Sequence, residues 1–485
     1  MSKGTEGLEL SAATMRAMGY GVVDRLVDRI VGLDEQPAWR GATREEMRSR
    51  LDGLGQELGV PLEDGLVGAG GDSPEGFEAL LDLLAEQVTP YRGNVDHPRF
   101  FAFVPSCPTW PGILGELMAA GLNAFQGTWL ESAGPSALEL EVLGWFRAWL
   151  EYPPESAGLL MSGGSAANLT ALVTAREDRL GADWRDGVIY ASEETHSSVF
   201  RAARILGFHA DRIRTVPHDR GFRLRPAALA EAVAEDRSRG LRPFLVVANG
   251  GATSTGAVDP LPALTELARE ENLWLHVDAA YGGFAILTDR GRTALTGIGD
   301  ADSVTLDPHK WLYQPFEAGC LMVRDGRKLE DAFHILPDYL QDTEVSRGSV
   351  PDDTEVNFAD RGLQLTRSWR ALKVWLTVRY WGIARIRAAI DRCIDLAERA
   401  EARIRESDTL ELLTPAALGI VCFKGPGGEE ADVRRVQRLS DSGVGMISST
   451  RVRGEYALRL CILGHRSGWE DVVAVIERLE RPIDR

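Results

Sequence analysis

Lysine is scarce in this chain. Of its 485 residues 54 are basic, and only five of these are lysines, so arginine carries nearly all of the positive charge. Lys3, Lys328 and Lys424 lie in terminal or turn-like polar sequence, which leaves Lys310 and Lys373 in apolar surroundings. A lysine amine held in an apolar pocket beside another proton-binding group has a lowered pKa and becomes a nucleophile at neutral pH. The two remaining lysines are therefore the candidates for chemistry.

Cysteine is also sparse, and long apolar runs are missing. The five cysteines are scattered without C-x-x-C spacing, which excludes a disulfide framework or a cysteine metal site and favours a reducing cytoplasm. No run approaches the roughly 18 apolar residues that cross a membrane, and the first residues lack the order of a signal peptide. The formal net charge of −18 argues against nucleic acid or an anionic membrane as a partner. We therefore expect a soluble cytoplasmic protein that binds a small molecule and no metal.

The pattern around Lys310 is an apolar strand, Ser303-Val-Thr-Leu306, followed by Asp307-Pro308-His309-Lys310. Taken alone, Lys310 is a surface lysine at a strand end. Upstream, the strand-like run 273–277 ends in Asp278, and a carboxylate at the end of a buried strand is destabilising unless a cation pairs with it. Pyridoxal phosphate offers that cation, because an aspartate can hold the proton on its ring nitrogen while a lysine binds it as a Schiff base.

Two further segments supply the other parts of such a site. The run Leu159-Leu-Met-Ser-Gly163-Gly164-Ser165 predicts a strand, a glycine turn and a helix start, where free N–H groups and the Ser165 hydroxyl form an anion site. Such turns are common on their own, and this one is not a G-x-G-x-x-G fingerprint. His196 follows a strand-like run and either stacks on a planar cofactor or is an ordinary core histidine. The joint occurrence of the four signals in one α/β region is the stronger evidence.

Together these segments resemble the group II pyridoxal-phosphate-dependent amino-acid decarboxylases, the aromatic-L-amino-acid decarboxylase family of fold type I. The resemblance covers nearly the whole chain and includes His97-Pro-Arg-Phe-Phe-Ala, His196-Ser-Ser-Val, His276-Val-Asp-Ala-Ala-Tyr-Gly-Gly, Pro308-His-Lys-Trp-Leu and Arg370-Ala-Leu-Lys-Val-Trp. It implies Lys310 as the Schiff-base lysine, Asp278 at the pyridine nitrogen and His196 stacked on the ring. It also implies a phosphate held by Gly164, Ser165 and His309, with Thr253 and Ala280 lining the cofactor.

The first 90 residues have the pattern of amphipathic helices without a core of their own. Met15, Met18, Val22, Leu26 and Ile30 keep helical spacing, and later segments begin with a capping box (43–46) and a Ser-Pro helix start (73–74). Such helices either pack on the chain's own large domain or, as the resemblance implies, lie across a second copy. We expect residues 1–90 to be the dimerisation segment of a homodimer.

From residue 158 to about 324, short apolar strands alternate with helical patterns. This predicts an α/β domain with a mostly parallel sheet, helices on both faces and a site beyond the carboxyl ends of the strands. We assign residues 91–375 to this large domain and residues 376–485 to a small C-terminal α+β domain with strands near 419–423 and 456–461. The proline-rich run 97–111 predicts an irregular loop. Its aromatics either pack within the loop or, as the resemblance implies, form a substrate-pocket wall of Phe103, Pro105 and Trp110.

The segment from Pro337 to about Leu365 is polar and predicts a mobile loop over the site. Alignment with the family places Phe358 where animal and plant members have the tyrosine that protonates Cα. If Tyr339, His334 or a second subunit supplies the proton instead, the reaction is simple decarboxylation to an amine and CO2. If no group does, O2 reacts and the products are an aldehyde, ammonia and H2O2.

Two other classes compete with a decarboxylase. One is a pyridoxal-fold scaffold without catalysis, although no polar group of the constellation is missing; the other is an aminotransferase, which normally needs an arginine for the α-carboxylate. Arg370 and Lys373, on a helix that starts near residue 366, form either a solvated basic face or part of the site. The aromatic candidates favour an aromatic or bulky L-amino acid as substrate, unless they are core; these are Phe103, Trp110, Trp129 and Phe316.

Overall fold

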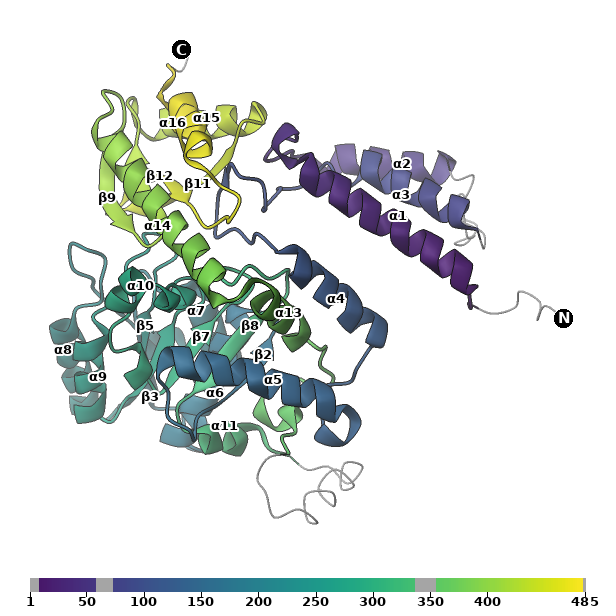
Figure 1. The fold of residues 1–485 in the computed structure, drawn as a ribbon. Coiled ribbons are helices and arrows are strands. Elements are labelled where there is room, and N and C mark those ends of the chain that lie inside the picture. Colours follow the sequence, from purple (N-terminus) through teal and green to yellow (C-terminus); the bar gives the residue numbers. More distant parts are fainter. Residues whose placement is uncertain (1–7, 58–72, 336–354, 483–485) are drawn as a thin grey trace.

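The computed structural model describes residues 8–57, 73–335 and 355–482, and its centre is a seven-stranded sheet (Figure 1). In spatial order the strands are β2 (Ala157–Met161), β8 (Gly319–Val323), β7 (Ser303–Leu306), β6 (Trp274–Asp278), β5 (Arg242–Asn249), β3 (Gly187–Ser192) and β4 (Ile213–Val216). Strand β8 is antiparallel to both neighbours, and the other neighbouring pairs are parallel. The predicted fold, a mostly parallel sheet in an α/β domain, is confirmed.

Helices cover both faces of this sheet, which is why most of its strands are buried along their whole length. Helix α6 (Gly164–Arg179) packs on the central strands and on α7 (Ser197–Ile205). Helices α8 (Pro226–Ser238) and α9 (Leu261–Glu270) pack on each other and on β5, and α10 (Asp289–Ala294) follows them in the chain. Helix α11 (Gly326–Phe333) packs on α6, and α5 (Trp129–Leu150) packs against β2 and β8. The carboxyl ends of the parallel strands are left open for a site.

The C-terminal part forms a second sheet with its own core. The spatial order is β1 (Phe100–Phe101), β11 (Met446–Val452), β12 (Glu455–Cys461), β10 (Ile420–Lys424) and β9 (Glu411–Ala417). Its helices are α14 (Ile383–Arg405), α15 (Gly428–Asp441) and α16 (Trp469–Glu480). The two predicted strands correspond to β10 and β12, whereas β9 and β11 were not predicted.

The prediction of an irregular loop at residues 97–111 is wrong for part of that segment. Phe100 and Phe101 form β1, which pairs in parallel with β11 of the C-terminal sheet. Thr109 caps α4 (Trp110–Leu122), and a proline in the first helical turn is compatible with the helix because its missing N–H would have no partner there. Trp110 therefore lies at the start of a helix.

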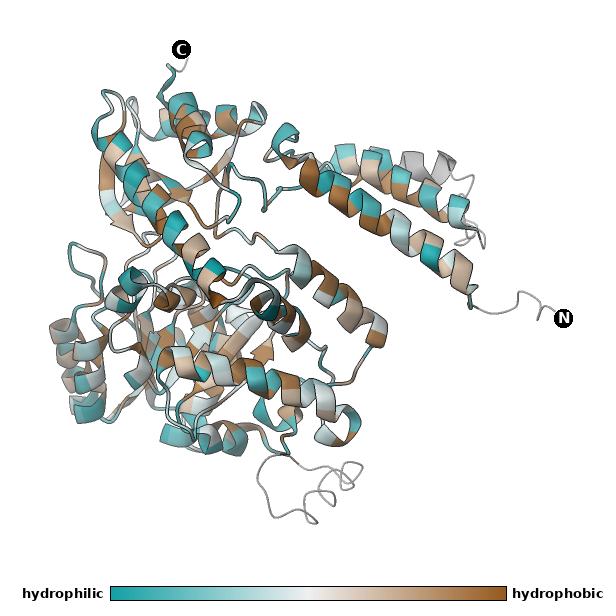
Figure 2. Ribbon diagram, in the orientation of Figure 1, coloured by the Kyte–Doolittle hydropathy of each residue, from teal (hydrophilic) through white to brown (hydrophobic). Residues whose placement is uncertain are grey.

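Three N-terminal helices stand apart from both sheets (Figure 1): α1 (Ala12–Val31), α2 (Arg44–Glu57) and α3 (Pro74–Gln87). The predicted capping box is present, since the Thr43 hydroxyl accepts from the N–H of Glu46 and Glu46 accepts from the N–H of Thr43. Helices α1 and α3 contact each other, yet neither has a buried residue. Figure 2 shows apolar residues along α1. Several of them are exposed to solvent, among them Met15 at 55% and Val27 at 39% exposure.

Residues 337–354 of the predicted mobile loop, including Tyr339, lie outside the described residues. The chain re-enters with a short 3₁₀ helix, η7 (Phe358–Arg361), and continues into α13 (Ala371–Trp381), which packs on α4. The part of the chain that the structure describes also contains the 3₁₀ helices η1 (Leu33–Glu35), η2 (Ala210–Arg212), η3 (Gly283–Leu287) and η4 (Ile298–Asp300). Within the described ranges, no helix combines the length and apolar composition needed to cross a membrane.

Candidate active site

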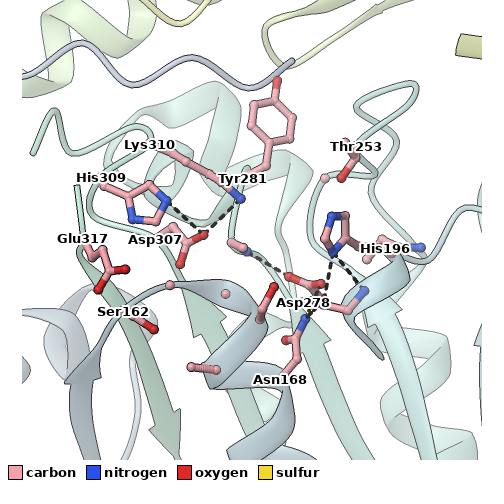
Figure 3. Close-up of a pocket in the computed structure, with 18 residues that line it drawn as sticks. Ser162, Asn168, His196, Thr253, Asp278, Tyr281, Asp307, His309, Lys310 and Glu317 are labelled. Atoms are coloured by element: carbon pink, nitrogen blue, oxygen red, sulfur yellow. Dashed lines mark hydrogen bonds and ion pairs between the residues drawn. The ribbon is translucent and has the colours of Figure 1, made fainter. Parts of the chain in front are cut away.

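A cavity of about 340 Å³ lies at the carboxyl ends of the parallel strands (Figure 3), where open α/β sheets bind ligands. Every residue that the sequence assigned to a cofactor lines it: Gly164, Ser165, His196, Thr253, Asp278, Ala280, His309 and Lys310. Each follows a strand end or begins a helix, so the sheet alone brings together segments far apart in the chain.

Lys310 enters the cavity from the turn after β7. Its Nζ lies 3.0 Å from Oδ2 of Asp307, a carboxylate that is 2% exposed. The Nδ1 of His309 accepts the N–H of Ala318, so its protonated Nε2 faces the same Asp307 oxygen at 3.5 Å. Burial lowers the pKa of His309, which keeps this imidazole neutral at pH 7. Asp307 therefore holds the lysine in place.

Asp278 ends β6 and is 7% exposed. Its Oδ2 accepts from Nδ2 of Asn168 at 2.8 Å, and its Oδ1 accepts from the N–H of Ala280 at 3.2 Å. Both donors are neutral, and no described residue forms an ion pair with this carboxylate. A buried carboxylate in this state retains its full charge for a cation that enters the cavity.

His196 caps the start of α7. Its Nδ1 accepts from the N–H of Ser198 at 3.2 Å and from the Ser198 hydroxyl at 2.8 Å. A neutral imidazole whose Nδ1 accepts carries its proton on Nε2. Partial burial lowers the pKa of His196, so the neutral form with a single Nε2–H donor is present at pH 7.

The amino end of α6 forms the floor of the cavity at its Gly163–Ser165 end. The first N–H groups of a helix have no partner within it and carry the positive end of the helix dipole, which makes this end an anion site. Space is tight: a Cβ on Gly164 would lie 3.0 Å from Cβ of Ala280 and 3.1 Å from Oδ2 of Asp307. A side chain at residue 164 would fill this space, so the glycine leaves room for a ligand at the amino end of α6.

The structure does not bring Phe358 to this cavity. Its ring is 0% exposed in the core, where the Arg367 guanidinium lies 4.7 Å from the ring centroid. Arg367 in turn forms a buried ion pair with Glu139 and donates to the Leu160 carbonyl of β2. The placement of Phe358 at the reacting carbon, predicted from alignment, therefore needs correction: residue 358 is a core position under β2.

The other residues, predicted to contact the substrate, lie outside the lining of this cavity. Phe103 is 63% exposed and Pro105 is buried; neither lines the cavity, and Trp110 and Trp129 do not either. Phe316 is 56% exposed and lies against the His309 ring at 5.0 Å.

Three charged residues that the sequence raised as candidate site residues are buried or form ion pairs. His334 Nδ1 lies 3.3 Å from Oδ1 of Asp360. Arg370 and Lys373 are buried, so the alternative of a solvated basic face is wrong. Lys373 pairs with Glu116 at 2.6 Å, which ties α13 to α4. Of the two lysines in apolar sequence, Lys310 alone lines the cavity.

Asn168 and Asp307 were not predicted as site residues from the sequence. Asp307 had a detectable signal, because an aspartate three residues before a lysine in a turn can reach the lysine amine. Asn168 had none, because its partner Asp278 lies 110 residues away in the chain.

Comparison with known proteins agrees with this geometry. The model of the pyridoxal-dependent decarboxylase conserved domain matches residues 68–425. The aromatic-L-amino-acid decarboxylase of Bacillus atrophaeus is 37% identical, over 98% of this chain and 97% of the relative. The solved structure of Oryza sativa TDC with PLP and tryptamine is 28% identical, with a TM-score of 0.88 and 98% of each chain covered. That of Rhodiola rosea 4-hydroxyphenylacetaldehyde synthase is 26% identical, with a TM-score of 0.85 and 97% of each chain covered.

Proposed function

The chain belongs to the family of pyridoxal-dependent decarboxylases, and from that premise we propose that it converts an aromatic or bulky L-amino acid to the amine and CO2. The cofactor is pyridoxal 5′-phosphate and the enzyme is an amino-acid decarboxylase. One observation carries the proposal: a buried, uncompensated Asp278 carboxylate lines the same cavity as Lys310.

The cavity fits this cofactor. Asp278 has no cationic partner among the described residues, which suits a protonated ring nitrogen. The amino end of α6, with Gly164 and Ser165, suits the phosphate, and His309 lies beside it. Lys310 is the amine that would bind the aldehyde. When bound, pyridoxal phosphate supplies an electron-accepting ring that stabilises the negative charge left on Cα after CO2 departs.

The chain's own residues orient the substrate and handle protons. Asp307 Oδ2 is positioned to accept the proton that Lys310 Nζ must lose before it acts as a nucleophile. Asp278 would pair with the protonated ring nitrogen of the cofactor. We assign to the Nε2–H of His196 a hydrogen bond that would hold the substrate carboxylate, the group that is released as CO2.

The proposal of an aromatic substrate rests on Phe103 and on the similarity to an aromatic-L-amino-acid decarboxylase. Arg459 of β12 donates to the carbonyl of Phe103 and to that of Thr253, both at 2.6 Å. Since Thr253 lines the cavity, Arg459 holds the Phe103 loop next to it. Although none of the three lines the cavity itself, we propose that Phe103, with Pro105 and Trp110 on the same segment, forms a wall beside it that contacts the substrate side chain.

A panel of L-amino acids tests this assignment. Purified holoenzyme is given tryptophan, tyrosine, phenylalanine, glutamate and leucine, and CO2 and amine are measured. We expect the aromatic substrates to have the highest kcat/KM, and Phe103→Ala to raise KM for them about tenfold with little change in kcat. Lys310→Ala is the inactive control. Highest activity on glutamate, or equal loss in Phe103→Ala for all substrates, would contradict the substrate class.

The oxygen-dependent reaction is the second candidate, because the chain is similar to 4-hydroxyphenylacetaldehyde synthase. The sequence supported this reaction through Phe358, which replaces a tyrosine proton donor, but Phe358 lies in the core. Tyr339→Phe tests the remaining tyrosine raised by the sequence. Aldehyde from this variant, where the parent gives amine, would identify Tyr339 as the proton donor; unchanged amine would point to another group, such as one from a second subunit.

We further propose a homodimer in the cytoplasm. Support for the dimer comes from the apolar side chains exposed on α1, which its own chain leaves uncovered. Support for the compartment comes from the five buried, unpaired cysteines. Sedimentation equilibrium should give a mass near twice 53.0 kDa, and a Leu26→Asp plus Val27→Asp variant should shift the equilibrium to monomer. A monomeric parent protein would refute the dimer.

A further inference from the structure

One side-chain amide connects Asp278 to His196. Asn168, on α6, is 1% exposed, and its Nδ2 donates to Oδ2 of Asp278 at 2.8 Å and to Oγ of Ser198 at 2.9 Å (Figure 3). Its Oδ1 accepts from the Thr305 hydroxyl at 2.8 Å and from Nε2 of His276 at 3.0 Å. All four hydrogen-bonding positions of the amide are occupied, which fixes its orientation with the nitrogen toward the carboxylate.

Behind this amide, the neutral side chains of Trp274, Ser303 and His276 form a line of hydrogen-bond donors that ends at Asn168. The indole of Trp274 donates to Oγ of Ser303 at 2.8 Å, and Ser303 lies 2.8 Å from Nδ1 of His276. Because Oδ1 of Asn168 can only accept, Nε2 of His276 carries the ring proton, and Nδ1 of the neutral ring accepts from the Ser303 hydroxyl. His276 is 0% exposed, and burial lowers its pKa to about 4, so it stays neutral at pH 7.

Every donor in this line points toward Asp278. Aligned hydrogen bonds polarise one another, so the line stabilises the carboxylate charge. Because each member is neutral, it does so without pairing that charge, which stays available for a cation in the cavity. A lysine or arginine at residue 168 would instead form an ion pair with Asp278 and compete with that cation.

The same amide reaches His196 through Ser198. Oγ of Ser198 accepts from Asn168, so its own proton is given to Nδ1 of His196 at 2.8 Å. Together with the N–H of Ser198, this donation holds His196 in the tautomer that carries its proton on Nε2. One hydrogen bond to Asp278 and one of the two hydrogen bonds to Nδ1 of His196 thus depend on Asn168.

We propose that Asn168 is a positioning residue that orients the Asp278 carboxylate toward the cofactor and, through Ser198, fixes the Nε2–H form of His196. This rests on the proposed function in so far as it takes His196 to meet the substrate carboxylate. Its effect on Asp278 requires only the cofactor.

The substitution Asn168→Asp tests the first arm. It keeps the shape of the side chain, removes the N–H donor and places a second carboxylate beside Asp278. Pyridoxal phosphate is titrated into the apoenzyme, its dissociation constant is measured by fluorescence, and the visible absorption band of the bound cofactor is recorded. We expect affinity to fall about 10- to 100-fold, since a hydrogen bond to a charged group is lost and a like charge is added, together with a shifted band.

Asn168→Thr restores one donor and should recover part of the affinity. Thr174→Val is the matched control on the same helix, since the Thr174 hydroxyl is buried but donates only to the Thr170 carbonyl at 3.0 Å. It should bind the cofactor as the parent does. If Asn168→Asp does not fold, judged by its circular dichroism, the comparison of Asn168→Thr with Thr174→Val decides.

Ser198→Ala tests the second arm. It should leave cofactor affinity within about twofold and raise the substrate KM severalfold, because only the His196 branch is cut. Parent-like affinity and an unchanged band in Asn168→Asp, or equal weakening by Thr174→Val, would overturn the proposal for Asp278. An unchanged KM in Ser198→Ala would overturn it for His196. A parent enzyme that binds the cofactor and releases no CO2 would refute the proposed function while leaving the affinity result intact.

Discussion

Asp278 and Asp307 are two buried carboxylates of one cavity with opposite surroundings. Asp278 contacts neutral donors, whereas Asp307 lies 3.0 Å from the Lys310 amine. The first carboxylate is free to pair with a cation from outside the chain, and the second already has one. Identical residue types at two strand ends therefore have different roles, set by their neighbours.

This difference predicts different effects of the same substitution. Asp278→Asn removes the charge that holds a protonated ring nitrogen, so we expect kcat to fall by about 100-fold or more and cofactor affinity to fall with it. Asp307→Asn keeps a hydrogen-bonding group beside Lys310 and removes negative charge near the phosphate end, so the cofactor should bind at least as tightly. Titration of both apoenzymes, with kcat measured on the loaded forms, checks this; equal losses in the two variants would contradict it.

A substitution at Phe358 should change the stability of the protein and leave its product unchanged. A hydroxyl added to this 0%-exposed ring enters an apolar core, which costs roughly 1–3 kcal/mol when no partner is available. Urea unfolding of Phe358→Tyr, beside analysis of its amine and aldehyde products, tests both statements. A parent that makes aldehyde and a variant that makes amine would restore Phe358 to the mechanism.

At the scale of elements, apolar runs predicted the alternating strands of the large sheet, because strands buried on both faces need continuous apolar sequence; only the edge strand β4 is partly exposed along most of its length. The two-residue strand β1 was missed, since it exists only through its pairing with Met446 and Ile447, far along the chain. The motifs and the family resemblance predicted the residues that line the cavity because each lies close to a strand or helix end. Phe358 and Asn168 could not be placed, because burial under β2 and a bond to β6 are not visible locally.

The contact between α4 and α13 depends on a glycine. A Cβ on Gly115 would lie 2.6 Å from the Cα of Lys373, so Gly115→Ala forces the two helices apart. We expect it to lower the free energy of unfolding by about 1–3 kcal/mol. Gly121→Ala, on the same helix with no atom within 4 Å, should instead raise it by up to about 1 kcal/mol. Denaturant unfolding of the pair tests this; equal effects would contradict the close contact.

At the scale of the whole molecule, buried histidines set the response to acid. Burial lowers the pKa of His97, His276 and His465 from 6.5 to about 4. Between these values the unfolded chain binds protons that the folded chain does not, so the free energy of unfolding falls as pH falls. Each contributes about 1.4 kcal/mol per pH unit in that window. Asp259, whose pKa burial raises to about 6, opposes them below pH 6.

We therefore expect the apoenzyme to be less stable at pH 5.5 than at pH 7.0. Urea unfolding at both pH values measures the difference, and His465→Gln should reduce it by about 1 kcal/mol. His209→Gln, at a side chain that is 83% exposed, is the control and should leave it unchanged. A His465→Gln variant with the parent's pH dependence would contradict this explanation.

The central claim is that this protein releases CO2 from an amino acid and protonates the remaining carbon. The most direct test is the stoichiometry of the purified holoenzyme with its preferred aromatic L-amino acid in air, with CO2, amine and oxygen uptake measured in one vessel. We expect one amine for each CO2, no oxygen uptake and the same rate under argon. One aldehyde, one ammonia and one H2O2 for each O2 consumed, with no amine, would contradict it.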